Sequence, residues 1–315
     1  MIKNKKIFIT GGAGYLGKNI ISRYYKDNEI TVFSRDEAKH YYLQKNFPNI
    51  KCIIGDIRNL DLLVKSSKKH DVGIFAASLK QIEAVDSNHQ EANEIIIKGG
   101  INSRIAAEEN LSSACFISSD KSRAATTLYG AMKFVAGESF IVNAEESKVK
   151  LSTAIYGNVI NSTGSIIPLI WDSIINNYEL TLYSEEMTRF IIHPNDAVNL
   201  VEFSLKKTGY NVIPKARSIL IKDLFEIFSE KFKLKYKIGE PRISEKIHEI
   251  MISREESPRV ISDGDYYLMH YKKVSKNNLF KKGDYSSKNF VISKCELKQI
   301  LEDNNYYNPY EQRIY

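Results

Sequence analysis

Hydrophobic and polar positions in the first half of the chain alternate between two repeat lengths. Short apolar and β-branched runs, typical of strands, recur at 6–10, 29–33, 50–54, 72–76, 114–118 and 150–154. Longer segments with helical spacing lie between them, at 14–25, 37–46, 60–68, 91–109 and 126–146. The strand segments are almost continuously apolar, as expected when helices cover both faces of a sheet. This alternation predicts right-handed crossovers and an α/β fold with a doubly wound parallel sheet of Rossmann type.

This alternation ends after about residue 155. The pattern there predicts a helix that includes 168–177, strands at 180–183 and 187–192, and a helix over 194–206. From about residue 240 the chain is polar and rich in turn residues. We therefore expect a Rossmann domain over 1–158, to which 188–215 contribute. A smaller α/β region, formed by 159–187 and 216–315, would cover the ends of its strands.

Three glycines follow the first predicted strand. Gly11, Gly14 and Gly17 give the spacing G-x-x-G-x-x-G between a strand and an amphipathic helix. Glycines at such positions let the backbone turn tightly and approach a pyrophosphate, whose charge then faces the helix N-terminus. In this context the glycines predict a dinucleotide-binding site, to which Tyr15 and Leu16 also belong.

The ends of the next strands indicate which dinucleotide is bound. Ser34 and Arg35 follow the second strand, where a basic residue accommodates the extra phosphate of NADP and an acidic one would bind the ribose of NAD. We therefore predict NADP rather than NAD; in the alternative, Asp36 caps the next helix and Arg35 faces solvent. Asp56 is either an acceptor for the adenine amino group or a helix N-cap. The remaining predicted cofactor contacts are Ile57, Ala76 and Ala77.

A group of reactive side chains follows the fifth strand. Ser119, Asp120 and Lys121 end the strand, and Tyr129 and Lys133 occupy one face of the next helix. A lysine beside a phenol lowers the pKa of the phenol and can also hold the cofactor ribose. A reductase or a simple epimerase needs only the hydroxyl, the tyrosine and the lysine. The adjacent acid and base indicate an elimination; their alternative role is an ion pair that orders the loop.

Composition narrows the class of partner. The 315 residues carry a net charge of +7 and are 43% hydrophobic. The lysines are scattered and no basic run alternates with aromatics, so we predict no nucleic-acid partner and favour a small anionic substrate. No apolar run approaches ~18 residues, so no membrane partner is predicted and we expect a cytoplasmic protein. The three cysteines fit no metal motif, and no metal site is predicted.

The chain resembles the inverting UDP-N-acetylglucosamine 4,6-dehydratases, which are extended short-chain dehydrogenases of polysaccharide biosynthesis. The resemblance covers nearly the whole sequence, and Met187-Thr188-Arg189-Phe190 is especially characteristic. It lies in the segments 10–17, 34–37, 55–58, 76–81, 119–121, 128–133, 156–159, 164–168, 187–190, 214–215, 245–249 and 285–287.

The resemblance implies how the reaction would proceed. Tyr129 would take the proton from the sugar O4 while hydride passes from C4 to NADP. Lys121 would remove the C5 proton, and Asp120 would protonate the departing C6 hydroxyl. Reprotonation of C5 from the other face would invert that centre. Lys133 would tune Tyr129 and bind the cofactor ribose, and Ser119 would polarise O4. The product would be a UDP-2-acetamido-4-keto-2,6-dideoxy hexose for surface-glycan synthesis.

The resemblance also implies substrate contacts and an assembly. Lys80, Asn158, Arg189 and Glu249 would contact the UDP-sugar, and the last three face its nucleotide half. The alternative for Arg189 is a structural ion pair. Family members are often dimers or hexamers, so we expect a homo-oligomer. Two other functions stay open: a UDP-sugar 4-epimerase or 4-reductase on the same scaffold, and an NADP-binding sensor or scaffold without turnover.

Four positions depart from the family pattern. Ile95 and Ile96 occupy the places of a Thr-Asn pair whose asparagine often supports a proton-relay water or the catalytic helix. Ile155 replaces a common arginine, and Ala125 replaces a common proline. The acid, the base and the hydride path stay in place, whereas the sugar, the rate and the C5 outcome are left open.

Overall fold

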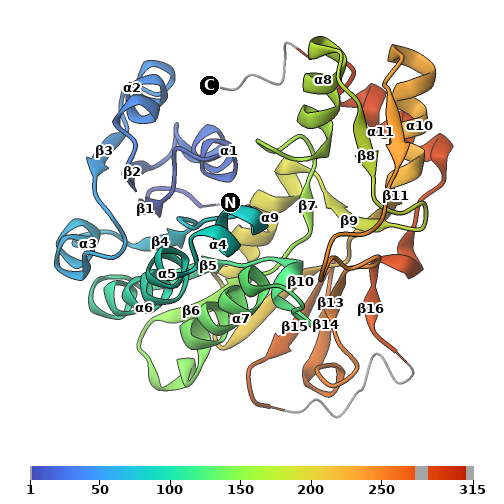
Figure 1. Ribbon diagram of the computed structural model, residues 1–315. Coiled ribbons are helices and arrows are strands. Elements are labelled where there is room, and N and C mark those ends of the chain that lie inside the picture. Colours follow the sequence, from blue (N-terminus) through green and yellow to red (C-terminus); the bar gives the residue numbers. More distant parts are fainter. Residues whose placement is uncertain (1, 274–282, 310–315) are drawn as a thin grey trace.

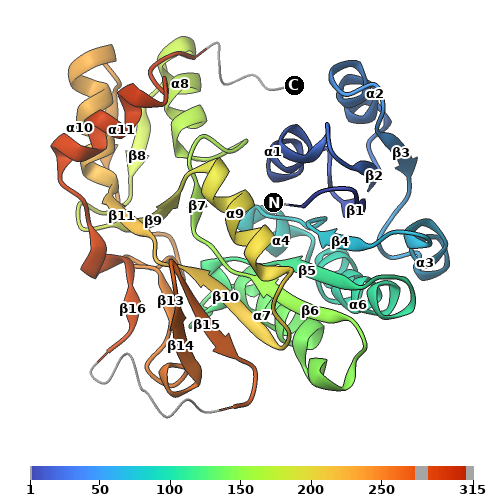
Figure 2. The same ribbon diagram turned by 180° about the vertical axis from the view of Figure 1, so that it is seen from behind.

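The central layer of the protein is a twisted sheet, seen from opposite sides in Figures 1 and 2. The computed structural model describes residues 2–273 and 283–309. Within these residues, nine strands form the sheet in the order β14 (Val260–Asp263), β15 (Tyr266–His270), β10 (Tyr210–Pro214), β6 (Lys150–Ala154), β5 (Ser113–Ile117), β4 (Val72–Phe75), β1 (Lys6–Thr10), β2 (Glu29–Ser34) and β3 (Lys51–Ile54). Every pairing from β10 to β3 is parallel, whereas β15 and β14 add to the edge in antiparallel orientation.

Helices pack on both faces of this sheet (Figure 1). One face is covered by α1 (Tyr15–Tyr24), α2 (Glu37–Asn46) and α9 (Pro194–Ser204), and the other by α3 (Leu60–Ser67), α6 (Gly99–Asn110) and α7 (Leu128–Ile141). The inner strands β1 and β4 bury nearly all of their residues because both faces are covered. The predicted doubly wound Rossmann fold is therefore confirmed.

Helix starts follow from side chains that cap them. Asp36, Asn59 and Thr127 each accept a hydrogen bond from the backbone N–H three residues on, at 2.9, 3.0 and 3.1 Å. Such caps satisfy amides that have no partner within the helix. Asp36 is therefore the cap of α2, as the alternative reading of that residue held. Asn59 caps α3, so the N-cap alternative for Asp56 is wrong.

The remaining elements form a smaller region beside the carboxyl ends of the parallel strands. Its helices α8 (Ile166–Asn176), α10 (Ile221–Phe232) and α11 (Lys294–Asp303) share an apolar cluster that includes Trp171 and Phe228. Short sheets complete it, formed by β11 (Arg217–Leu220), β9 (Thr188–Ile192) and β7 (Asn158–Val159), by β12 (Tyr236–Ile238) and β8 (Leu180–Leu182), and by β13 (Ile250–Ile252) and β16 (Tyr285–Ser286).

The predicted division of the chain stays a prediction, but sheet membership refines it. From the stretch 188–215, α9 and β10 join the layers of the large sheet, whereas β9 does not. From the stretch 216–315, β14 and β15 pair onto the large sheet through β10. The polar, turn-rich composition of that stretch concealed these strands, which cover an edge that would otherwise be exposed.

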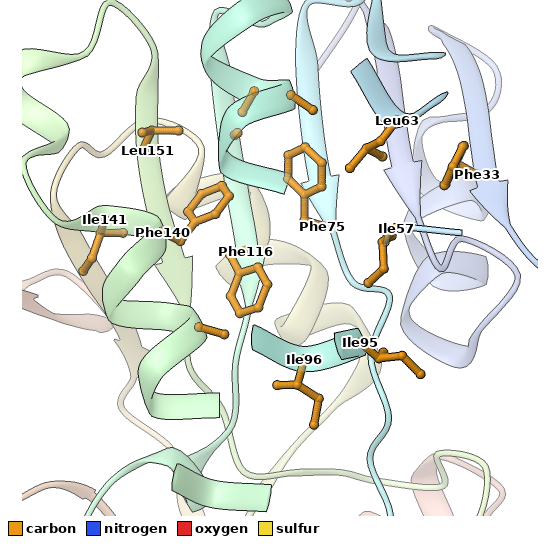
Figure 3. Packing of buried hydrophobic residues seen from close by; sticks show 14 of the residues in the cluster. Phe33, Ile57, Leu63, Phe75, Ile95, Ile96, Phe116, Phe140, Ile141 and Leu151 are labelled. Carbon is orange, nitrogen blue, oxygen red and sulfur yellow. The ribbon is translucent and has the colours of Figure 1, made fainter. Parts of the chain in front are cut away.

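The connection after β4 is helical but irregular. α4 (Ile82–Ser87) and α5 (His89–Ala92) lead into a π-helical segment, Asn93–Lys98, and then into α6. Ile95 and Ile96 lie on this segment, are 5% and 1% exposed, and join the core cluster that contains Phe116 and Tyr129. Figure 3 shows Ile95 on the side of Ile57 and Ile96 on the side of Phe116. Apolar packing therefore fills the place where the family pattern has Thr-Asn.

Replacing Ile96 by alanine should leave a cavity beside α7. We expect the free energy of unfolding in urea to fall by about 2–4 kcal/mol, because buried methylenes are lost without full collapse of the site. Ile175→Ala is the matched control, since Ile175 is 59% exposed on α8; its loss should stay under about 1 kcal/mol. Equal losses in the two variants would show that Ile96 does not pack in the core.

Candidate active site

The glycine loop forms a cradle at the point where the strand order reverses, between β1 and β4. Gly11 has a φ of +68°, and a Cβ placed there would lie 2.8 Å from the backbone N of Ala77. A Cβ on Gly17 would overlap the backbone of Gly12. A Cβ on Gly14 would have the Gly11 carbonyl oxygen as its nearest neighbour, at 3.2 Å. The three glycines thus serve the turn, the close helix packing and the open approach that a pyrophosphate needs, so the loop fits a dinucleotide.

Tyr15 and Leu16 connect this loop to the smaller region. The Tyr15 hydroxyl donates to the carbonyl oxygen of Ile160 at 3.2 Å. Burial raises the pKa of Tyr15 to about 12, so the hydroxyl keeps its proton. Leu16 packs against a small cluster that contains Val159. A dinucleotide bound at the loop would therefore lie next to the region that precedes α8.

The residues after β2 and β3 differ in how strongly their side chains are already paired with other protein groups. The Ser34 Oγ lies 2.6 Å from Nε2 of His40. Arg58 donates to Asp56 at 2.6 Å and lowers the pKa of that carboxyl. Arg35 is 56% exposed at its side chain and lies 3.8 Å from the Asp56 carboxylate. Its guanidinium is therefore accessible to a phosphate, while Ser34 and Asp56 already have protein partners. This geometry does not distinguish NADP from NAD.

β5 ends in a 3₁₀ turn, Asp120–Ser122, that carries the predicted acid and base. Ser119 donates from Oγ to Asp120 Oδ1 at 2.8 Å, and Lys121 Nζ lies 3.3 Å from the same oxygen. Asp120 is 1% exposed, and its Oδ2 has no hydrogen-bond partner among the described residues. Burial raises the pKa of Asp120, against the opposing charge of Lys121. Burial therefore makes it easier for the ionised Asp120 to take up a proton, as a general acid must before it can give one.

A second carboxylate contacts Lys121. Oε1 of Glu249 lies 3.1 Å from Lys121 Nζ, and Arg189 and Lys246 approach the same carboxylate at 3.9 and 3.6 Å. Burial alone would raise the pKa of Glu249, but Lys121, Arg189 and Lys246 lower it overall. Burial likewise opposes the charge on Lys121, but Asp120 and Glu249 outweigh it and raise the Lys121 pKa. Lys121 is therefore an ammonium ion in the resting protein.

Tyr129 and Lys133 lie on the buried face of α7. Gly130 allows this approach, because a Cβ there would overlap the carbonyl group of Lys121. Burial raises the pKa of Tyr129 to about 12, and Lys121 is the cation that acts to lower it. Lys133 Nζ donates to the Ile117 carbonyl at 2.8 Å, and burial lowers its pKa to about 7. The cation expected to tune Tyr129 was Lys133, whereas in this structure Lys121 has that effect.

The predicted substrate contacts lie in three places. Glu249 is buried against Lys121, as described above. Arg189 is 7% exposed and pairs with Glu245 at 3.1 Å while donating to two backbone carbonyls. This arrangement is the structural ion pair named as its alternative role. Lys80 Nζ donates to the carbonyl of Thr163, at the loop before α8. Contacts of these residues with a substrate stay predictions.

Asn158 lines a small apolar recess between β7 and α8. The recess also contains Asn161 and Ser165. The Oδ1 atoms of both asparagines and the Oγ of Ser165 are buried without a hydrogen-bond partner in the part of the chain that the structure describes. Buried polar atoms without partners are rare and point to a missing ligand or water.

Several residues that shape the site had no predicted role. A Cβ on Gly157 would lie 2.7 Å from the Phe190 Cβ and 3.2 Å from Asp120 Oδ2, so only glycine lets β9 pass the acid this closely. Glu245 and Lys246 complete the charges around Arg189 and Glu249. All three lie in segments that carry the family resemblance, and the Glu-Lys-x-x-Glu spacing was the available signal.

Comparison with known proteins identifies the family. The model of the family described as Polysaccharide biosynthesis protein matches residues 7–271. The chain belongs to this family. Its members are enzymes, and the resemblance to the inverting dehydratases is confirmed by relatives of that name.

One such relative is a UDP-N-acetylglucosamine 4,6-dehydratase (inverting) from Campylobacter jejuni, 33% identical over 97% of this chain and 99% of its own length. A UDP-glucose 4-epimerase from Rickettsia bellii is 33% identical over 85% of this chain and 83% of its own. The X-ray structure of Pen from Bacillus thuringiensis superposes with a TM-score of 0.89 at 29% identity, covering 96% of this chain and 99% of that one. The activity that these family relatives support is the modification of UDP-sugars.

A relative from Methanocaldococcus jannaschii, 34% identical over 96% of this chain and 97% of its own, is named an uncharacterized membrane protein. Within residues 2–273 and 283–309, no helix is both long and apolar enough to cross a membrane. The cytoplasmic location stays a prediction.

Gly11→Ala should weaken dinucleotide binding. The left-handed backbone costs an L-residue about 1–2 kcal/mol, and the new Cβ would lie 2.8 Å from the Ala77 amide nitrogen. We expect the loop to shift and the Kd for NADP to rise at least about tenfold by calorimetry. Gly264→Ala is the matched control, since Gly264 has a φ of +56° and its Cβ would meet nothing within 4 Å. Its Kd should equal that of the wild type; equal Kd values for all three proteins would place the cofactor elsewhere.

Proposed function

We propose that this enzyme removes water from UDP-N-acetylglucosamine at C4/C6 with inversion at C5, using NADP. The product is a UDP-2-acetamido-4-keto-2,6-dideoxy hexose. The observation that carries this proposal is the contact of an acid and a base, Asp120 and Lys121, in a buried turn next to Tyr129. Simple transfer of hydride at C4 requires no such pair, whereas elimination needs one group to take a proton and another to give one.

NADP is proposed to lie on the glycine loop, with Arg35 at its extra phosphate and Lys133 at its ribose. When bound, it supplies an acceptor and later a donor of hydride. Tyr129 accepts the O4 proton as a phenolate that the Lys121 charge stabilises, and Ser119 polarises O4. Lys121 takes the C5 proton.

Asp120 delivers a proton to the C6 hydroxyl, which leaves as water. Its burial supports this role, because an ionised carboxylate is costly in a site that is closed to water. A carboxyl in such surroundings holds its proton until a leaving group can take it.

The nucleotide half of the substrate is proposed to lie at the recess that contains Asn158. The unpaired amide oxygens and hydroxyl there support this assignment, because a uracil ring offers polar edges to match them. Arg189 is 7% exposed and would have to exchange part of its pairing with Glu245 to reach a pyrophosphate. Lys80 lies at the loop that borders the recess and would contact the same half.

A UDP-sugar 4-epimerase or 4-reductase is the second candidate. The related proteins named UDP-glucose 4-epimerase favour it, since Ser119, Tyr129 and Lys133 suffice for that chemistry. The contact of Asp120 with Lys121 favours dehydration instead. A sensor or scaffold that binds NADP without turnover would need neither Asp120 nor Lys121.

The enzyme is also proposed to form a homo-oligomer, either a dimer or a hexamer. α6 and α7 support this, because Ile101, Leu128 and Val135 are each 43% exposed on these two neighbouring helices, and Val142, which follows α7 directly, is equally exposed. Apolar side chains gathered on one surface are typical of a protein interface.

Incubation with UDP-N-acetylglucosamine in deuterated water tests the function. We expect the product mass to fall by one water and proton NMR to show deuterium at an inverted C5. Lys121→Ala and Asp120→Asn should each slow this reaction by about 10²-fold or more, because a general base or acid is lost.

Lys65→Ala and Asp61→Asn are the controls, as both residues are exposed on α3; they should match the wild type. If C4 is epimerised or reduced without loss of water, the second candidate is correct. Tight NADP binding with no turnover of any UDP-hexose would favour the sensor.

Arg35→Ala tests the choice of cofactor. We expect the Kd for NADP to rise about tenfold, because a charge-assisted contact to the extra phosphate is lost. The Kd for NAD should change by less than about twofold, since NAD lacks that phosphate. Arg254→Ala, an exposed arginine before β14, should change neither value. A wild type that binds NAD more tightly than NADP would contradict the assignment of Arg35.

A further inference from the structure

Glu249 belongs to a buried group of charges that a role in nucleotide binding does not explain. Its carboxylate is supplied from just before β13, yet its Oε1 lies 3.1 Å from the Nζ of Lys121 in the turn after β5. Glu249 is 3% exposed. The group contains three cations and three carboxylates: Lys121, Arg189, Lys246, Asp120, Glu245 and Glu249.

The two carboxylates that contact Lys121 have different surroundings. Each has one buried oxygen without a hydrogen-bond partner among the described residues, Oδ2 of Asp120 and Oε2 of Glu249, but Lys121 is the only cation that pairs with Asp120 among these residues. Glu249 has Arg189 and Lys246 near it in addition to Lys121. Burial raises the pKa of Asp120, whereas the three cations lower that of Glu249 despite its burial. Asp120 is therefore the carboxylate that can take a proton, and Glu249 is the one that stays charged.

We propose that Glu249 is a positioning residue that holds the Lys121 ammonium against Asp120, so that one proton transfer produces the base and the acid together. The transfer breaks an N–H bond at Lys121 Nζ and forms an O–H bond on the Asp120 carboxyl, 3.3 Å away. Both groups become neutral, and the net charge of the site does not change. This inference rests on the proposed function, which gives Lys121 and Asp120 their roles.

Glu249 also sets the pH at which Lys121 loses its proton. The titratable and charged groups around Lys121 come from four elements. They are Asp120 from its own turn, Tyr129 from α7, Arg189 from β9, and Lys246 and Glu249 from the segment before β13. Glu249→Gln keeps the side-chain size and removes one negative charge. The ammonium is then stabilised less, so it releases its proton at lower pH.

The test compares the wild type with Glu249→Gln and Glu245→Gln. The second variant also removes a carboxylate from Arg189 but none from Lys121. For Glu249→Gln, we expect the pH range over which kcat is highest to move down by about 1–3 pH units. Its maximal kcat should fall about tenfold or more, because Lys121 is less well placed, while KM stays within about twofold. Glu245→Gln should leave the pH range where it is in the wild type.

Competitive acetylation of Lys121, read by peptide mass spectrometry, gives its titration midpoint without turnover. The Lys121 side chain is 26% exposed, so the reagent can reach it. The midpoint should move to lower pH in Glu249→Gln alone. An unchanged midpoint and pH range, with a raised KM, would overturn the proposal and make Glu249 a nucleotide contact.

Two further outcomes separate the proposals. If the wild type releases no water but the Lys121 midpoint still moves, the proposed function is wrong and the coupling of Glu249 to Lys121 stands. If Glu249→Gln does not fold, Glu249→Asp takes its place in the test. This variant keeps the negative charge but moves it away from Lys121 by one methylene. We then expect an unchanged pH range with kcat lowered about tenfold; undiminished kcat would overturn the proposal.

Discussion

An ammonium ion held between two buried carboxylates is the interaction on which the site depends. A buried charge is costly unless it is paired, and breaking a buried pair costs about 3–5 kcal/mol. Lys121 takes one partner from its own turn and the other, Glu249, from beyond residue 240. Ser287 in turn fixes the backbone of Glu249. Its Oγ accepts from the Glu249 N–H at 2.9 Å, and its own N–H donates to the Glu249 carbonyl at 2.8 Å. The first half of the chain therefore cannot satisfy this charge alone, and the site is complete only when the second half packs onto it.

Glycines determine how closely these halves approach each other. Gly130 lets the start of α7 touch the backbone of Lys121, and Gly157 lets β9 pass beside Asp120. A methyl group at Gly130 would overlap the Lys121 carbonyl, and one at Gly157 would crowd Phe190, so either would push these segments apart. These two residues have no chemistry of their own. They act by leaving out a Cβ where three backbone segments meet, which explains their place in the motifs that contain Tyr129 and Asn158.

The sequence was sufficient for the features that are local or periodic. The parallel strands and the glycine loop follow from short-range patterns, and the structure has them where they were expected. The cap at Asp36, which was only the alternative for that residue, is equally local. The pairing of Glu249 with Lys121 was not predictable, because 128 residues separate them and the contact depends on how the two regions pack. β15 was missed for a related reason: its tyrosines and histidine look polar in sequence, but the strand is stabilised by its neighbour β10.

The charges also impose an order on the chemistry. Lys121 lies close enough to lower the pKa of Tyr129, and no polar side chain at positions 95 and 96 of the adjoining π-helical segment shares that task. The charge on Lys121 therefore favours the phenolate form of Tyr129. Once the phenolate has taken a proton, Lys121 has lost one of the negative charges that stabilise it, and it gives up its own proton more readily. Under the proposed mechanism, deprotonation of O4 would thus prepare the base for C5. A site in which Lys133 alone served Tyr129 would have no such coupling, and it would suit epimerisation better than elimination.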